Sequence, residues 1–160
     1  MKGKFYLILV LLVLTVNGVF AQRQETLAKF IITDATMNGV DVTPTLLSNK
    51  AYTVFYTSDN DGLIYMANVW PKSNSQSYGP MYSIENQKKR ETYETYEADI
   101  FYFNWRYINT YDNKKGTAKV QVIKIYKPQG VAFTVKIIPE NLDITIYKGY
   151  MEGTIDFSDY

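Results

Sequence analysis

The 160-residue sequence contains no cysteine and no histidine. Without cysteine, the chain has no disulfide, no thiolate nucleophile and no zinc–thiolate or iron–sulfur centre. Without histidine, it has no imidazole-dependent triad or metal site, and no side chain that titrates near neutral pH in the absence of a pKa shift. No spacing in the sequence brings Asp, Glu, Tyr, Lys or Ser together convincingly. We therefore predict that the protein is not an enzyme and needs no cofactor or metal.

An excess of charge of one sign is also missing, since 17 Lys and Arg stand against 16 Asp and Glu. Nucleic acids and anionic lipids bind basic surfaces, so we predict no nucleic-acid partner. A membrane-spanning run is absent too. The longest apolar run, at residues 5–16, is well short of the roughly 20 residues that cross a bilayer.

That run has the features of a secretory signal peptide. Lys2 and Lys4 precede it, and Val19-Phe20-Ala21 supplies a cleavage site. We predict a signal peptide at residues 1–21 that is cleaved after Ala21, no stable membrane insertion afterwards, and a single domain at residues 22–160. The protein is then secreted or periplasmic, and it is not a lipoprotein, because that anchor is built on a cysteine.

The domain shows apolar residues at every second position, which is typical of half-buried antiparallel strands. About eight strands are expected, at residues 26–33, 51–57, 63–70, 78–84, 96–109, 117–127, 131–137 and 142–148.

Short turns separate these strands, at residues 59–62, 112–116, 127–130 and 139–141. In the second turn, Gly116 is expected to take the left-handed conformation. One short helix is expected near 44–49, with Thr43 as its N-cap and Pro44 in its first turn.

The fold class is therefore all-β, an up-and-down meander that closes into a barrel. A β-sandwich is the alternative, because both architectures share this strand rhythm. Residues 117–127 change parity between Val122 and Ile123, which predicts a β-bulge at that point.

The start of the domain carries a more specific pattern. Residues 27–32 (LAKFII), 37–44 (MNGVDVTP) and 51–56 (AYTVFY) form a strand, an Asn-Gly-x-Asp-x-Thr connection and a Tyr-Thr-x-x-Phe strand. In this order they resemble small secreted bacterial lipocalin-like (calycin-type) barrels. The resemblance covers residues 25–85 in detail. It departs from animal lipocalins, since Phe30 stands where their Gly-x-Trp has tryptophan. It implies a cup with an apolar or aromatic interior and a small-molecule ligand.

Aromatic residues are abundant, with 15 Tyr, 8 Phe and 2 Trp. Tyrosine and tryptophan combine a large apolar face with a polar tip, which suits both ligand cups and protein-facing surfaces. They also fill cores, so each candidate has a purely structural interpretation as well. The candidate ligand-binding residues are Tyr65, Trp70, Tyr102, Trp105, Arg106 and Tyr107.

Arg106 stands out because it interrupts an apolar strand. On the inner face it could hold a ligand carboxylate, whereas on the outer face it would stack on a neighbouring aromatic ring, which is the favoured interpretation.

Asp59 and Asp61 form half a calcium motif and are better explained by a turn. Glu91, Glu94 and Glu97 lie in a hydrophilic stretch, where a solvated loop explains them better than a catalytic pair.

Two functional hypotheses follow from these features. The first is an exported β-barrel module that binds an apolar or amphipathic small molecule in its open end, which requires a cavity. The second is a cell-envelope structural or protein-interaction domain without a small ligand, which requires a packed interior and an exposed aromatic surface. An outer-membrane barrel and an enzyme are weaker alternatives.

Overall fold

The computed structural model describes residues 24–58, 61–85, 88–140 and 143–160, so the predicted signal segment lies outside the described residues. Parts of the predicted turns and of the last predicted strand (Asp59, Asn60, Asn141 and Leu142) also lie outside them.

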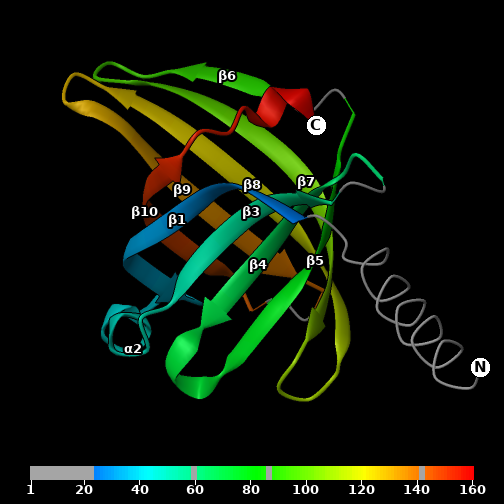
Figure 1. Cartoon of the computed structure of the whole chain (residues 1–160). Helices are drawn as coiled ribbons and strands as arrows, with labels where there is room; N and C mark the ends of the chain where they lie inside the picture. Colours follow the sequence, from blue (N-terminus) through cyan, green and yellow to red (C-terminus); the bar gives the residue numbers. More distant parts are fainter. Residues whose placement is uncertain (1–23, 59–60, 86–87, 141–142) are drawn as a thin grey trace, which may run out of the picture.

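Eight antiparallel strands close into a barrel, as the sequence predicted (Figure 1). Each strand pairs with the next, and the last pairs with the first from Ala28↔Gly153 to Met37↔Thr145. This closing ladder rules out the sandwich. The barrel strands are β1 (Gln24–Met37), β3 (Tyr52–Ser58), β4 (Ile64–Trp70), β5 (Ser75–Ser83), β7 (Glu97–Asn109), β8 (Lys115–Lys127), β9 (Gly130–Pro139) and β10 (Thr145–Gly153).

Two short strands were not predicted. β2 (Val40–Asp41) pairs with the end of β1, and β6 (Lys89–Thr92) pairs with the start of β7. The 3-10 turns η1 (Pro71–Ser73) and η2 (Phe157–Asp159) complete the elements.

The predicted helix is present as α2 (Thr43–Ser48), but Thr43 is not its N-cap. The Thr43 hydroxyl instead accepts a hydrogen bond from the backbone N–H of Ala35 in β1, at 2.8 Å. The hydroxyl thus ties the helix to the barrel.

The turn between β7 and β8 also differs from its prediction. Asn113 takes the left-handed conformation, with φ of 56°. Gly116 lies within β8, opposite Tyr107, and an added Cβ there would lie 2.5 Å from the Tyr107 ring. Gly116 is therefore needed for packing rather than for the turn.

Bulky side chains fill the barrel interior. Because side chains alternate across a strand, every second residue points inward, and these residues form a single core. The largest fully buried side chains are Phe30, Phe55, Phe103, Ile64, Met66, Met81, Val120, Val122, Val135 and Thr53.

The β-bulge predicted in β8 was wrong. The ladders of β8 with β7 and with β9 keep one register along the described strand, including Val122 and Ile123. The parity change has another cause: the inward-facing positions become polar at Lys124 and Tyr126, beyond the apolar Val122. Register shifts occur in β1 instead, between Ile32 and Asp34 and between Thr26 and Ala28.

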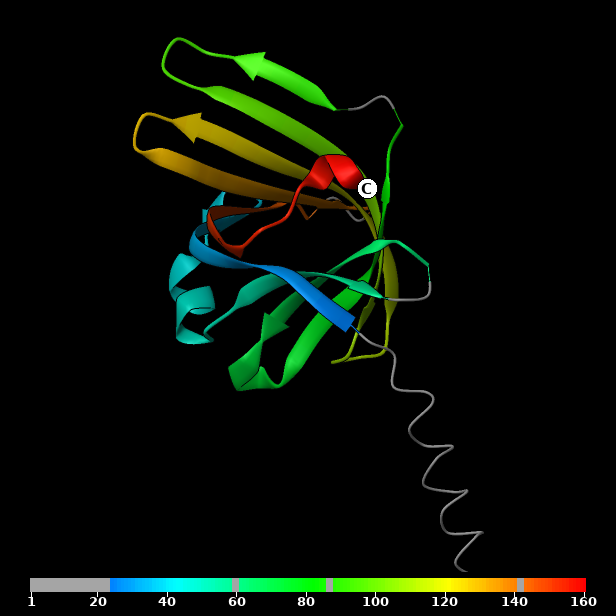
Figure 2. The same ribbon diagram turned by 45° about the horizontal axis from the view of Figure 1, so that its top comes forward.

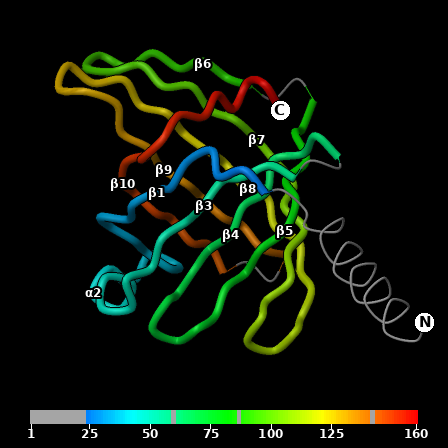
Figure 3. The backbone as a smooth tube through the Cα atoms, in the orientation of Figure 1, coloured from blue at the N-terminus to red at the C-terminus, as the bar shows by residue number. Residues whose placement is uncertain are grey.

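The polar positions lie where part of the sheet leaves the barrel. β9 pairs with β10 from Phe133 to Ile137, whereas its ladder with β8 continues to Gly130. The β6–β7 and β8–β9 hairpins therefore extend beyond the ring of strands (Figure 2). After β10, the chain crosses the resulting opening (Figure 3).

Tyr147 gives the interior an alkaline pH dependence. Its side chain is buried, and burial raises its pKa from 10.0 to about 12. In the unfolded chain the phenol ionises near pH 10, so the stability linked to Tyr147 is complete below pH 10 and is lost as the pH rises towards 12. Over this range the free energy of unfolding should fall in both proteins, but in Tyr147→Phe it should fall by about 2–3 kcal/mol less than in the wild type. Urea unfolding at each pH measures the difference. Equal losses in the two proteins would contradict the assignment.

Candidate binding surfaces

The six predicted site residues separate into two groups. Trp105 is 2% exposed and belongs to the core. Trp70 is half-buried and packs against that core. Tyr102 is half-buried on the outer face of β7. The other three, Tyr65, Arg106 and Tyr107, line one hollow of about 520 Å³ on the barrel wall.

Trp105 is fixed by an irregularity in the neighbouring strand. Proline has no N–H and therefore interrupts a ladder, and the β5–β7 pairing is broken between Tyr78 and Met81, around Pro80. The Gly79 carbonyl there accepts a hydrogen bond from the Trp105 indole N–H at 3.1 Å. Trp105 thus holds the wall together from inside.

Arg106 points outward, as the sequence analysis favoured. Its guanidinium carbon lies 4.9 Å from the centre of the Tyr82 ring, in a cation–π arrangement. On the next strand, Thr117 lies opposite Arg106 and donates a hydrogen bond to Glu140. A second hollow of about 440 Å³ also includes Arg106, Thr117 and Glu140, so Arg106 stands between two hollows.

A row of side chains crosses this wall, and we call it the outer row. Tyr56 lies opposite Tyr65, and Tyr65 lies opposite Pro80. The register on either side of the break places Pro80 opposite Arg106. The outer row consists of Tyr56, Tyr65, Pro80, Arg106, Thr117 and Glu140, and Tyr78 and Tyr82 flank it on β5. Its first member, Tyr56, is only 9% exposed, so the accessible part of the row begins at Tyr65.

Contacts among the aromatic residues make this row rigid. The Tyr56 and Tyr65 rings stack with centroids 5.2 Å apart, and the Tyr65 hydroxyl donates to Asp61 at 2.6 Å. That hydrogen bond raises the pKa of Tyr65 to about 12 and lowers the pKa of Asp61. Asp61 also accepts from the Leu63 backbone N–H at 3.0 Å, so the described half of this loop is consistent with the turn interpretation.

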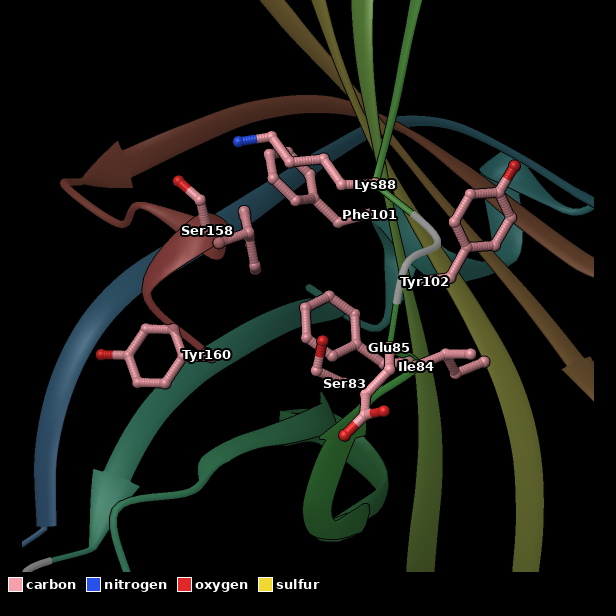
Figure 4. A pocket seen from close by; sticks show the side chains of 10 residues that line it. Ser83, Ile84, Glu85, Lys88, Phe101, Tyr102, Ser158 and Tyr160 are labelled. Atoms are coloured by element: carbon pink, nitrogen blue, oxygen red, sulfur yellow. The ribbon is translucent and has the colours of Figure 1, made fainter.

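A third hollow, of about 460 Å³, lies at the barrel opening beside η2 (Figure 4). Its lining includes the predicted site residue Tyr102 together with Lys88, Phe101, Ser158 and Tyr160. Phe157 also lines it, and sequence reasoning missed this residue. The available signal was a single phenylalanine among polar residues after the last strand.

Sequence reasoning also missed a polar cluster on the extended hairpins. Asp99 is 9% exposed and accepts hydrogen bonds from Arg90, at 3.1 and 3.3 Å, and from the Tyr126 hydroxyl, at 2.9 Å. Arg90 also pairs with Glu97. Asp99 sits in an apolar strand between Ala98 and Ile100, which was the available signal. Because each partner is satisfied, the cluster stabilises the projecting strands.

The chain matches no protein-family model, and neither a curated protein nor a solved structure shows significant similarity to it. Among the described residues, acidic side chains do not gather into a group that could hold a metal ion. The helices within these residues are also too short or too polar to cross a membrane.

Proposed function

We propose that this protein is an exported, non-enzymatic interaction module that binds another protein of the cell envelope through the outer row. The observation that carries the proposal is the register that aligns tyrosines and one arginine across four adjacent strands. The packed interior supports an external binding surface over an internal one, because the core already occupies the space that a cup would need.

The chemistry of the outer row suits a protein partner. Tyrosine and arginine are enriched at protein interfaces, where rigid rings lose little conformational entropy on binding. Tyr56 and Tyr65 are already held by stacking, and Arg106 by Tyr82. Glu140 at the far end adds a negative charge, so the row offers apolar, cationic and anionic contacts in a fixed order.

Site-specific photo-crosslinking in the cells that produce the protein tests this proposal. A benzophenone amino acid at Tyr78 should give an adduct of defined mass, and Arg106→Glu should reduce its yield at least tenfold, as expected for a central interface residue. The same probe at Tyr150, which is exposed on β10 across the barrel, is the matched control. Absence of an adduct at position 78, or the same adduct from both positions, would contradict the proposal.

A second candidate function is the binding of an apolar or amphipathic small molecule, favoured by the hollow where Tyr65, Arg106 and Tyr107 meet. Its size and mostly apolar lining fall within the range of known ligand sites. Native mass spectrometry of residues 22–160 should then show an excess mass that disappears on denaturation and is absent from Arg106→Gln. A bare monomer mass from the wild type would count against this candidate.

We also propose that the barrel is lipocalin-like and that cleavage after Ala21 releases it into the periplasm or the medium. The strand order and the short helix after the first strand support the first part, and the amino-terminal sequence supports the second.

A further inference from the structure

The outer face of the projecting hairpins is apolar, which reverses the pattern of the barrel. On β8, Ile123 and Ile125 point outward, because Val122 points into the core and side chains alternate along a strand. Neither isoleucine belongs to the core or packs against it. On the inner face of the same strand, Lys124 and Tyr126 are polar. The parity change along β8 thus marks the point at which the apolar face of the sheet changes from the inside to the outside.

The pairing register extends this apolar surface over neighbouring strands. β6, β7 and β8 each place two residues on the outer face, and the ladders align them in two rows. One row is Lys89, Ile100 and Ile123, and the next row is Glu91, Ala98 and Ile125. We call these two rows the hairpin face. Each row is charged at the β6 edge and apolar across β7 and β8.

The two sides of the projecting sheet are covered differently. On the inner side, η2 places the Phe157 ring 5.7 Å from the Phe101 ring. On the outer side, the extensive contacts of β6, β7 and β8 within the described part of the chain are with neighbouring strands, and α2 packs on β1 instead. An apolar sheet face normally packs against a second layer, and a joined apolar surface marks an interaction site. The described chain does not supply that layer for the hairpin face.

The two rows of the hairpin face are complementary to each other. A two-fold axis that runs across the strands, between the rows, would lay each row on the other row of a second copy. Lys89 then faces Glu91 of the second copy, and Glu91 faces Lys89 of that copy. Ala98 faces Ile100 in the same way, which sets a small side chain against a large one, and the isoleucines of β8 face each other. Charge and shape therefore both match a second copy of this chain.

We propose that the hairpin face is the contact surface of a homodimer, in which two copies stack their projecting sheets face to face. The sheet there is four strands wide and about four outward residues long, so each copy offers roughly 500 Å² and the pair buries about 1,000 Å², the lower limit for a specific interface. The dimer should therefore be reversible. From Ile100 to Arg106, β7 runs about 20 Å, so the outer row stays outside this contact. The proposal does not depend on the function proposed for the outer row.

Sedimentation velocity of the purified protein over a range of concentrations tests the dimer. We expect a monomer–dimer equilibrium with a dissociation constant on the order of micromolar. Ile125→Lys should weaken the dimer at least tenfold, because it places an unpaired charge in the contact. Ile31→Lys is the matched control, since Ile31 is a half-buried isoleucine on the outer face of β1, beside the exposed Tyr150, and its replacement should leave the dimer unchanged.

The charged edge tests the register of the two copies. Lys89→Glu and Glu91→Lys each set like charges opposite one another in the dimer, so each variant alone should associate at least tenfold more weakly than the wild type. A mixture of the two variants, one labelled at its amino terminus with a fluorophore, restores opposite charges at both contacts and should form a heterodimer of nearly wild-type affinity. Within each variant chain the like charges remain, so this recovery cannot arise inside β6.

Three results would overturn the proposal. The first is a wild-type protein that stays a monomer near millimolar concentration. The second is a dimer that Ile125→Lys leaves unchanged, or that Ile31→Lys weakens equally, since the contact would then lie elsewhere. An edge-to-edge pairing of β6 strands would give this result, because Ile125 lies two strands away from that edge. The third is a mixture of the two charge variants that forms no heterodimer.

Discussion

Replacing Gly149 by alanine should destabilise the barrel by at least about 3 kcal/mol, because the clash falls on backbone that cannot move aside. Gly149 lies in β10 at the last residue of its ladder with β9, where it also pairs with Ile32 of β1. A Cβ at this position would lie 1.9 Å from the Ile31 carbonyl oxygen and 2.9 Å from its carbonyl carbon. Relief of the clash requires β1 and β10 to separate, which opens the seam that closes the barrel. Urea unfolding measures the loss.

Gly116→Ala is the matched control for this prediction. Gly116 also lies within a paired strand, but its added Cβ would meet the Tyr107 ring rather than backbone. Since the half-buried side chain of Tyr107 can shift more easily than backbone can, we expect a loss of only about 1 kcal/mol. Equal losses at the two glycines would show that the Ile31 carbonyl is not the obstacle.

Replacing Trp105 by alanine should cost about 3–5 kcal/mol, the usual range for a large aromatic removed from a core. The indole is 2% exposed, packs with its centre 4.6 Å from that of the Tyr107 ring, and donates to the Gly79 carbonyl. Trp105→Phe keeps most of the apolar volume but leaves that carbonyl without the indole donor, so we expect an intermediate loss of about 1–3 kcal/mol.

Thermal or urea unfolding measures both variants, and Trp70 remains as the fluorescent reporter in each. A Trp105→Ala protein as stable as the wild type would contradict the structural role. The result also decides between two interpretations of the sequence, since a ligand-binding tryptophan can be removed at little cost in stability.

The alternation of apolar residues predicted the strands well because each face of a strand is set by the chain itself. The boundaries of β4 and β7 differ from their predictions by about one residue, whereas those of β1, β5 and β10 differ by up to five residues. Alternation does not reveal what an inward face contacts once the strand leaves the core. In β8 the inner face changes from Val122 to Lys124 without a bulge, because the strand extends beyond the ring.

The outer row could not be predicted for a different reason. Its members come from separate strands, and only the pairing register makes Tyr65 a neighbour of Tyr56 and Pro80. Spacing along the chain singled out Tyr65, Arg106 and Tyr107, which do meet, but it also selected Trp105, whose role depends on the break at Pro80. Phe157 escaped notice because a segment after the last strand carries no periodicity.

The ladder between β1 and β10 sets the order in which this protein can fold. It joins the first strand to the last, with partners such as Thr33 and Lys148 that are 115 positions apart. Such distant pairing has a high entropic cost, so we expect slow folding dominated by the search for this contact. During synthesis, β1 emerges early but cannot acquire its final partner until almost the whole chain is available. The chain therefore stays open until late, which suits the export proposed above, because a translocation channel needs an open chain. With no cysteine in the sequence, no premature disulfide can form in any compartment.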